Sequence, residues 1–399
     1  MIRTTPFHER TSALNETQLW SHWSGTLAAN RYQVSDKMEY FAVRNAAGVF
    51  DSSPLYKYRI TGKEAEAFLA GILARDIRAC PPGQAQYTCW LDDNGFVIED
   101  GVILHTSKNE YLLTSAEPNM AYLQDRSGRH DVTIEDVSDE LGTLALQGPR
   151  SRDLLKKLVP QMEKIPYFGV AKGEIGGAGV TVSRTGYSGD LGYEVWIDTP
   201  DALHVWDTLW DSMEGHGVLP FGLAALEMLR IEAGLLLMEA DFDSSRYAWN
   251  DAHRSTPIEL GWSWMFKDLR ADDRAFIGRK ALEREMAGKT SRWAMRGLIL
   301  DWQDYDRVYD RAGLVPPKDH TPVLEDWMLY DDEYKRVGYA TSFMYSPMLQ
   351  RHIAIARVRP DLARLGTKVN IETTVNHQYE LVAAHVARLP LYNPERKTA

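Results

Sequence analysis

The sequence changes in character near Ser291, and this change sets the domain organisation that we expect. Before this position, segments with helical periodicity alternate with segments that read as strands. Beyond about Trp293, short β-rich runs are separated by turn residues, and helical periodicity is absent. These runs are residues 297–301, 327–330, 336–342, 353–358, 368–372 and 379–389. Short strands joined by turns are typical of small barrels, so we predict an α+β region over 1–290 and a β-barrel or jelly-roll domain over 291–399.

A β-hairpin is predicted in the first region. The strand-like residues 86–91 and 96–105 flank a turn signal that ends in Asn94-Gly95. An Asn-Gly pair between two strands is a strong hairpin signal, because both residues accept the backbone conformation of a tight turn. The hairpin puts Asp100 on its second strand.

A second strand pair is predicted from residues 179–184 and 192–198. Side chains alternate between the two faces of a strand. The apolar residues at positions 193, 195 and 197 therefore share one face, and Glu194 shares the other face with Trp196.

Two helices are predicted. Residues 61–64 have the sequence of a capping box, and apolar residues at helical spacing follow, which indicates a helix over 63–73. Residues 223–238 carry an apolar stripe at helical spacing. On another side of this second helix, Glu227 and Arg230 lie three residues apart, which is the spacing of a surface ion pair.

The charge balance argues against nucleic acid as a partner. The chain has 399 residues with 45 basic and 56 acidic side chains, which gives a formal charge of −11. Proteins that bind nucleic acid normally present a basic surface. The longest apolar run, 234–238, is far shorter than the roughly 20 residues of a membrane-spanning helix. We expect neither nucleic acid nor a membrane among the partners.

The cysteines and the first residues indicate a compartment. Cys80 and Cys89 match neither a Cys-x-x-Cys pair nor a disulfide framework, so we expect two buried thiols in a reducing environment. Residues 1–12 are interleaved with charges and lack the apolar stretch of a secretory signal. These features predict a cytoplasmic protein.

Several common kinds of active site are disfavoured by missing motifs. The 11 histidines are scattered and form no metal-binding cluster with nearby carboxylates or thiols, so we expect no metal site. The sequence also lacks the phosphate-binding loop of nucleotide kinases, the Gly-x-Ser-x-Gly of serine hydrolases, and a Gly-x-Gly-x-x-Gly between a strand and a helix.

Nine segments, in order along almost the whole chain, carry recognisable family signatures. They are 42–51 (AVRNAAGVFD), 84–103 (QAQYTCWLDDNGFVIEDGVI), 144–149 (LALQGP), 184–194 (RTGYSGDLGYE), 229–235 (LRIEAGL), 256–264 (TPIELGWSW), 276–282 (FIGRKAL), 337–347 (VGYATSFMYSP) and 389–394 (LPLYNP). Together they resemble the glycine cleavage system T-protein, the folate-dependent aminomethyltransferase, and its relatives. A chance match to one motif could not reproduce this order.

The resemblance implies a fold and a cofactor. Members of this family have three domains around a central opening that admits a reduced folate. We therefore expect two interleaved α+β domains, roughly 1–50 with 140–230 and 51–139 with 231–290, followed by the barrel over 291–399. The implied cofactor is tetrahydrofolate.

The resemblance also implies site residues. Asp100 corresponds to the catalytic aspartate of the family, because Ile98-Glu99-Asp100 resembles its Ile-Asp-Asp, and Glu194 corresponds to the glutamate that holds the pterin. Four further residues are implied at the folate site: Tyr87, Trp264, which forms an aromatic wall, Tyr392 and Arg230. Without the resemblance, Asp100 is interpreted as a carboxylate that binds backbone NH groups in a turn, and Glu194 as a solvated glutamate. The aromatic residues are then interpreted as packed side chains, and Arg230 as a partner of Glu227.

The chemistry of the two carboxylates suits such a role. A carboxylate accepts two hydrogen bonds side by side, and a pterin edge offers a ring NH beside an amino group, so Glu194 is suited to hold it. The folate amine N5 gains positive charge when it attacks a one-carbon unit. A carboxylate at hydrogen-bond distance stabilises that charge and orients or accepts a proton, which suits Asp100.

One departure from the family concerns the substrate side. Leu226 takes the place of a folate-site arginine, and the aspartate after it is changed to Glu227. Related losses occur in relatives that take one-carbon units from other donors, such as the folate domains of dimethylglycine and sarcosine dehydrogenases.

The 12 tryptophans and 19 tyrosines would permit an aromatic cage for a methylated cation, although most aromatic rings serve packing.

Three functions follow as expectations. The first is a tetrahydrofolate-dependent transferase that moves a methyl or aminomethyl group from a small donor to folate. The second is a true glycine cleavage aminomethyltransferase, whose donor is the lipoyl arm of a carrier protein, the H-protein. The third is a non-catalytic folate-binding assembly factor. That branch carries a reactive cysteine motif, whereas this chain has no cysteine after Cys89.

Overall fold

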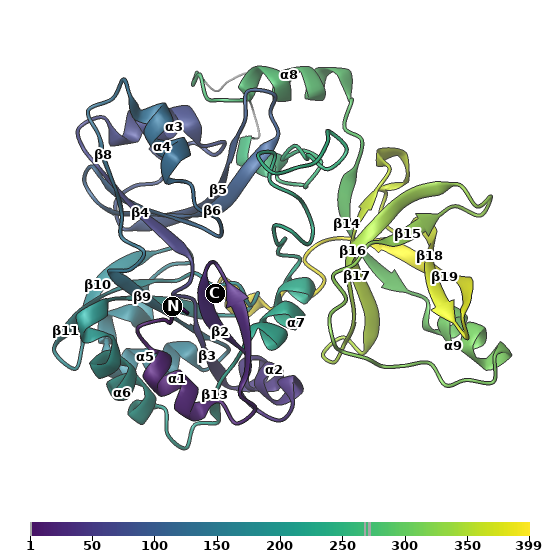
Figure 1. Ribbon diagram of the computed structural model, residues 1–399, viewed down its shortest axis with the longest axis horizontal. Helices are drawn as coiled ribbons and strands as arrows, with labels where there is room; N and C mark the ends of the chain where they lie inside the picture. Colours follow the sequence, from purple (N-terminus) through teal and green to yellow (C-terminus); the bar gives the residue numbers. More distant parts are fainter. Residues whose placement is uncertain (1, 267–268, 270–272) are drawn as a thin grey trace.

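The described residues form two large open sheets, a two-stranded ribbon and a closed barrel. The computed structural model describes residues 2–266, 269 and 273–399. In Figure 1 the two sheets lie one above the other on the left and the barrel lies on the right, with helix α7 (Leu223–Ala233) between them. This mixed architecture agrees with the predicted α+β fold and its C-terminal barrel.

The first sheet has six strands in the order β10-β11-β12-β9-β3-β13. Their bounds are Val170–Ile175, Ala178–Ser183, Gly192–Asp198, Leu141–Gln147, Ala47–Asp51 and Val218–Pro220. The helices of this part are α1 (His8–Leu14), α2 (Asp36–Asn45), α5 (Ser151–Leu158) and α6 (Ala202–Ser212). A two-stranded ribbon, β1 (Leu19–Trp23) with β2 (Thr26–Arg31), precedes α2.

The predicted strand pair of this sheet is confirmed, since β11 and β12 pair antiparallel. The apolar residues 193, 195 and 197 lie in one hydrophobic core with residues of α5 and α6. Trp196 belongs to a different cluster on the opposite face. Alternation along β12 thus turns Glu194 away from the helix-covered core.

The second sheet has five strands in the order β5-β6-β7-β4-β8. Their bounds are Gln84–Leu91, Val97–Ser107, Glu110–Ser115, Tyr56–Thr61 and Thr133–Asp136, and the helices beside them are α3 (Ala65–Ile72) and α4 (Met120–Ser127). The predicted hairpin is confirmed as β5 and β6, with Gly95 at φ +81° in the turn. The helix predicted over 63–73 is confirmed as α3, but its capping box does not form, because Glu64 instead accepts a hydrogen bond from the backbone of Asp131.

The C-terminal part is a closed six-stranded barrel, as predicted. The strands run in the order β14-β17-β16-β15-β18-β19, with bounds Ala294–Leu300, Arg351–Val358, Arg336–Ser346, Trp327–Tyr330, Lys368–Val375 and Gln378–Ala387. The expectation that this region lacks helices was wrong, since α9 (Trp302–Arg311) follows β14. Asp301 caps α9 by accepting two backbone hydrogen bonds. The aromatic and apolar residues 302, 305, 308 and 309 recur at helical spacing, so the prediction overlooked a helical pattern that the sequence contains.

Helix α7 is shorter than its pattern indicates. The prediction extended it to Met238, whereas Gly234 ends it in the left-handed conformation at φ +62°. Another helix, α8 (Arg279–Gly288), precedes the barrel strand β14 in the chain. The apolar residues after Gly234 therefore do not continue a helix face and lie along the central cavity described below.

Buried charges join α7 to the barrel and to the first sheet. Arg230 of α7 pairs with Asp241 at 2.6 Å and donates to the Ser342 hydroxyl of β16 at 2.9 Å. Glu232 of α7 pairs with Arg44 of α2 at 2.7 Å and accepts a hydrogen bond from Ser346 of β16. These charged side chains are almost fully buried. Each one therefore depends on the opposite charge of its partner to stabilise its own charge.

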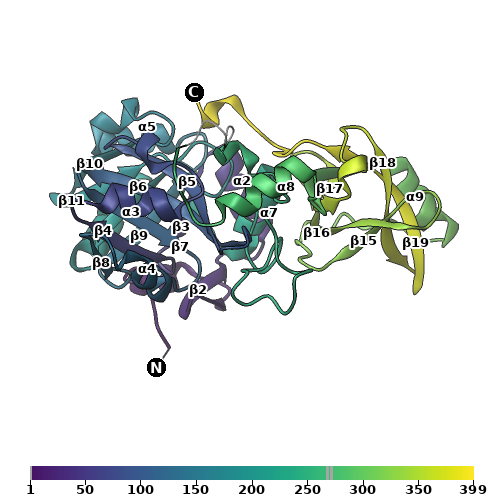
Figure 2. The same ribbon diagram turned by 90° about the horizontal axis from the view of Figure 1, so that it is seen from above.

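The segment after β19 runs back from the barrel towards the first sheet (Figure 2). Arg396 forms an ion pair with the buried Asp190 at 2.7 Å. Arg184 donates to the backbone oxygen of Ala399 at 2.6 Å. These contacts make the segment a second connection between barrel and sheet.

Two other observations concern the whole chain. Both cysteines are free and buried, as predicted. Among the helices of the described residues, none combines the length and the apolar character needed to cross a membrane. The division into 1–50 with 140–230 and 51–139 with 231–290 remains our proposal. The five-stranded sheet falls within the second part, and the six-stranded sheet falls within the first except for Asp51 at the end of β3.

Candidate functional site

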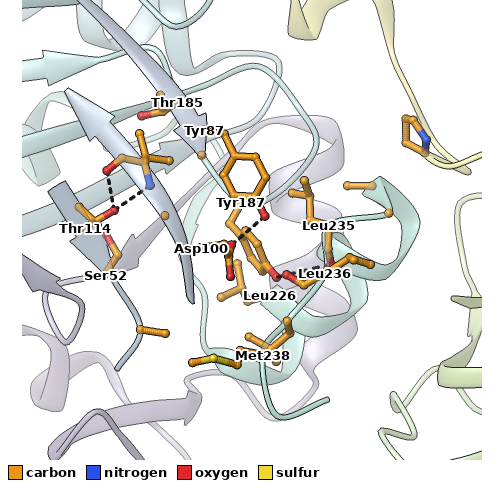
Figure 3. Close-up of a pocket in the computed structure, with 18 of the residues that line it drawn as sticks. Ser52, Tyr87, Asp100, Thr114, Thr185, Tyr187, Leu226, Leu235, Leu236 and Met238 are labelled. Atoms are coloured by element: carbon orange, nitrogen blue, oxygen red, sulfur yellow. Dashed lines mark hydrogen bonds between the residues drawn. The ribbon is translucent and has the colours of Figure 1, made fainter. Parts of the chain in front are cut away.

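A large cavity of about 1350 Å³ lies between the two sheets, α7 and the barrel. Its wall draws on all these parts of the chain. Four residues implied at the folate site line it, Tyr87, Asp100, Glu194 and Trp264. Figure 3 shows the region around Asp100, where Tyr87, Tyr187 and Leu226 surround the carboxylate.

Asp100 is held by strand β6 at the edge of this cavity. The Tyr87 hydroxyl of the neighbouring strand β5 donates a hydrogen bond to its Oδ2 at 2.7 Å. Burial raises the pKa of Asp100 to about 6, and the hydrogen bond from Tyr87 opposes that rise. The residue after it must be small, because a Cβ on Gly101 would collide with the backbone oxygen of Thr114 on β7.

Glu99, the residue before Asp100, is a second carboxylate and is almost fully buried. Its oxygens accept hydrogen bonds from the backbone amides of Asp100 at 3.2 Å and Glu117 at 3.1 Å, and from the Asn119 side chain at 3.4 Å. Burial and the nearby charge of Asp100 raise the pKa of Glu99 well above its ordinary value. The proton of the pair therefore resides mainly on Glu99, and Asp100 carries the negative charge near neutral pH.

Glu194 on β12 lines another part of the cavity. Its Oε2 accepts a hydrogen bond from the Thr185 hydroxyl, which in turn lies 2.6 Å from the Ser183 hydroxyl. Burial raises the pKa of Glu194, and the bond from Thr185 opposes the rise. Among the described residues Oε1 has no hydrogen-bond partner, so this oxygen is available to a ligand.

Aromatic rings extend the wall from Asp100. The rings of Tyr87 and Trp264 stack with centroids 6.4 Å apart, and Trp262 meets Tyr87 edge-on at 5.6 Å. The guanidinium of Arg75 lies over the Trp264 ring at 5.3 Å from its centroid. Trp264 is 41% exposed, which is unusual for a tryptophan and gives the cavity a flat apolar surface.

Tyr187 and Leu226 complete the surroundings of Asp100 (Figure 3). Tyr187 was not among the predicted site residues, although it lies within the family-like segment 184–194. Its hydroxyl donates to the backbone oxygen of Leu236 at 2.5 Å, which fixes the ring against the cavity. Leu226 is buried and gives this side of the cavity an apolar surface.

Two other predicted site residues are not part of the cavity wall. Arg230 is fully buried, and its guanidinium binds Glu227, as the spacing predicted, together with Asp241 and Ser342. The pair is therefore a buried one and not a surface one. The Tyr392 hydroxyl accepts a hydrogen bond from Arg396 at 2.9 Å, and its ring lies under Arg44 at 4.4 Å.

The cavity thus combines two separate carboxylates with aromatic and apolar surfaces. Within the part of the chain that the structure describes, no group of three or more histidine, cysteine, aspartate or glutamate side chains is placed to hold a metal ion. The arrangement suits a flat organic ligand with NH donors at one end and an amine that becomes positively charged.

Comparison with known proteins identifies the family. Residues 9–267 match the GCVT N-terminal domain, and residues 310–393 match the glycine cleavage T-protein C-terminal barrel domain. Aminomethyltransferase T of the glycine cleavage system from Bartonella henselae has the same fold, with a TM-score of 0.81 at 22% identity over 98% of this chain and 99% of that one.

Three relatives differ in the activity that their names state. "Trimethylamine-oxide aldolase" of Ruegeria pomeroyi is 31% identical over 99% of this chain, which spans about half (48%) of that protein. "Heme-dependent oxidative N-demethylase gamma subunit" of Ectopseudomonas mendocina is 30% identical over 97% of both chains. "Aminomethyltransferase" of Bacillus subtilis is 29% identical over 90% of this chain and 91% of that one. The chain therefore belongs to the glycine cleavage T-protein family of folate-dependent aminomethyltransferases.

Proposed function

We propose that this protein is a tetrahydrofolate-dependent one-carbon transferase, which moves a methyl or aminomethyl group from a small donor to tetrahydrofolate. One observation carries the proposal: Asp100 with its Tyr87 partner and Glu194, whose Oε1 has no partner among the described residues, line the same cavity. Carboxylates at two separate points of one cavity match a ligand with NH donors at one end and a reacting amine elsewhere.

The residues present fit tetrahydrofolate. Glu194 would hold the NH edge of the pterin through Oε1, while Thr185 keeps Oε2 in place. Tyr87 and Trp264 offer ring faces for the flat parts of the ligand. When bound, tetrahydrofolate supplies a nucleophilic amine that accepts the one-carbon group.

Asp100 and its neighbours would carry the catalytic step. The Asp100 carboxylate stabilises positive charge on a nearby amine and can take up its proton, because its pKa of about 6 keeps it ionised at neutral pH. Tyr87 orients the carboxylate through its hydrogen bond. Leu226 and Tyr187 exclude water from this side of the cavity, which strengthens the charge interaction.

The names of the relatives indicate two kinds of one-carbon donor. Two are named for chemistry on methylated amines, whereas a third is named an aminomethyltransferase. The apolar Leu226 in place of a cation favours a small donor over the lipoyl arm of an H-protein. Release of ammonia only with aminomethyl-loaded H-protein would instead identify a glycine cleavage enzyme.

Calorimetric titration with tetrahydrofolate tests the proposal. Wild type should bind, and Glu194→Ala should bind about 10- to 100-fold more weakly, because a hydrogen bond to a charged group contributes about 1.5–3 kcal/mol. Asp100→Asn should still bind but lose transfer activity with every donor of a screen of methylated amines, sulfonium compounds and loaded H-protein. Absence of binding by wild type would refute the proposal. Binding without transfer in wild type would favour the assembly-factor alternative.

A further inference from the structure

The ribbon of β1 and β2 contributes a tryptophan to the cavity wall. Ser24 and Gly25 form its two-residue turn with φ of +47° and +75°, the left-handed values that a tight hairpin turn requires. The Ser24 hydroxyl donates a hydrogen bond to the backbone oxygen of Ala116, just beyond β7, at 2.7 Å. Trp23, the last residue of β1, is half-buried and lines the cavity. The turn of the ribbon is therefore fixed to the second sheet with Trp23 in the wall.

Short contacts connect this part of the wall to Asp100. Glu117 follows the ribbon contact in the chain and donates its backbone amide to the Glu99 carboxylate at 3.1 Å. Glu99 directly precedes Asp100 on β6. The Trp23 ring packs against Phe50 with centroids 5.8 Å apart, and both residues line the cavity. The tryptophan therefore belongs to the wall beside the proposed reaction centre.

The fixed charges in this part of the wall are negative. We call this part the ribbon side, and it comprises residues 22–24, 50, 52, 55, 114–117, 223, 226, 227 and 233–239. These residues include no lysine or arginine, and His22 is the one side chain among them that can become positively charged.

Two of the three glutamates on the ribbon side lack a cationic partner. Glu227 is paired with Arg230 at 2.7 Å. Neither Glu117 nor Glu239 has a cationic side chain of the described residues within the 4.0 Å of an ion pair. Burial and the charge of Glu239 raise the pKa of Glu117, so the two carboxylates lie close enough to interact. A positively charged ligand would relieve this repulsion.

The other surfaces of the ribbon side favour a cation that carries alkyl groups. The face of an aromatic ring attracts cations, and indole does so most strongly among the aromatic side chains. The side chains of Leu223, Leu226 and Leu236 line the same side and offer no acceptor to an NH or OH donor. A cation whose charge is covered by methyl groups needs no such acceptor. Trp23 and its neighbours therefore suit an alkylated ammonium or sulfonium group.

We propose that Trp23, Glu117 and Glu239 form a subsite for a small alkylated cation, and that this cation is the one-carbon donor. The second part rests on the proposed function, because it needs an acceptor amine beside Asp100. Transfer would form a bond between the nitrogen of that amine and a methyl carbon of the cation. The bond from this carbon to the cationic nitrogen or sulfur would break, and its electron pair would leave with the neutral amine or thioether. Asp100 would take up the proton of the acceptor amine.

Calorimetric titration of the full chain with two probes tests the subsite. Choline carries a trimethylammonium group, and dimethylbutanol is its neutral analogue with carbon in place of the nitrogen. The proteins are wild type, Trp23→Phe, Trp23→Leu and the control Trp20→Leu. Trp20 lies on the same ribbon, packs against His8 at 5.0 Å between centroids, and is not part of the cavity wall among the described residues.

Wild type and Trp20→Leu should bind choline at least about tenfold more tightly than dimethylbutanol, because only choline has the charge that the ring face and the carboxylates attract. Trp23→Phe should keep part of this preference, since a phenyl ring attracts cations more weakly than indole does. Trp23→Leu should lose most of it. Tetrahydrofolate should bind to Trp23→Leu as it does to wild type, which shows that the variant is folded.

A second pair of variants tests the carboxylates. Glu117→Gln/Glu239→Gln should weaken the binding of choline and leave that of dimethylbutanol unchanged. The control Glu16→Gln/Glu174→Gln removes two exposed carboxylates outside the cavity wall, so it has the same change in net charge and should bind choline as wild type does. Titrations with tetramethylammonium and trimethylsulfonium then show whether the nitrogen or the sulfur cation binds more tightly. With tetrahydrofolate present, methylated tetrahydrofolate should form from at least one of the three cations.

Equal affinities of wild type for choline and dimethylbutanol would overturn the subsite. So would a preference that survives Trp23→Leu, or one that Trp20→Leu reduces just as much. Binding of the cations and of tetrahydrofolate without methyl transfer from any cation would overturn the donor assignment. If wild type binds choline as expected but does not bind tetrahydrofolate, the proposed function fails and the cation subsite is retained.

Discussion

Asp100 should lower the stability of the folded protein at neutral pH. The cavity raises its pKa from 3.8 to about 6, a shift of roughly two units. Each unit corresponds to about 1.4 kcal/mol, so the ionised carboxylate costs up to about 3 kcal/mol in the folded state. Asparagine keeps the size of the side chain and has no charge to desolvate. Asp100→Asn should therefore raise the free energy of unfolding, by about 1–2 kcal/mol after the loss of the strong bond from Tyr87.

The raised pKa of Asp100 also predicts how the stability difference between wild type and Asp100→Asn changes with pH. Between pH 4 and 6 the folded protein binds a proton at Asp100 that the unfolded chain has released, so the stability of wild type falls as the pH rises through this window. The advantage of Asp100→Asn should be small below pH 4 and complete above about pH 6.

Urea unfolding at a series of pH values measures both effects. Asp93→Asn, at an exposed carboxylate in the turn of the same hairpin, is the matched control and should leave stability within about 0.5 kcal/mol of wild type. An Asp100→Asn protein that is no more stable than wild type at pH 8 would refute the reasoning. So would a gain of the same size at pH 4 and pH 8.

Three further outcomes are expected. Tyr87→Phe should move the acid limb of the pH–activity profile to higher pH by about one unit, because it removes the hydrogen bond that lowers the pKa of Asp100. The control Tyr187→Phe removes a hydroxyl in the same cavity and should leave the acid limb in place. Arg230→Met should cost about 3–5 kcal/mol in urea unfolding, since it leaves a buried carboxylate without its cation; a loss below 1 kcal/mol would contradict the ion-pair assignment. Gly101→Ala should cost about 3 kcal/mol by the same measurement, because the new methyl group collides with the backbone of β7, and a wild-type stability would show that the strands can separate.

Sequence patterns that span only a few residues were sufficient to predict the strands that carry Asp100 and Glu194. The turn at Asn94-Gly95 fixes the hairpin, and alternation along β12 puts Glu194 on the face opposite the helix-covered core. Both signals act over a few residues, which is the range that a sequence pattern reports. The order of family-like segments then predicted a folate site beside these strands.

The errors come from contacts between distant segments. Helix α7 ends at Gly234, but the apolar residues after it continue a helix-like stripe because they line the cavity instead. Arg230 was correctly paired with Glu227, yet its burial depends on Asp241 and on Ser342 of the barrel, more than a hundred residues further along the chain. Tyr187 was missed because its position depends on a hydrogen bond to the backbone of a segment almost fifty residues away.

The buried charges of α7 also bear on how a ligand enters. A movement of the barrel away from the first sheet would separate Arg230 from Ser342 and Glu232 from Ser346. It would also expose the buried ion pairs of these two charged residues or remove one of the partners. Leaving a buried charge without its partner costs several kcal/mol, so such open states are expected to be rare. Ligands should therefore reach the cavity without such a movement, and their association rates should depend on ionic strength and ligand charge more than on the motion of whole domains.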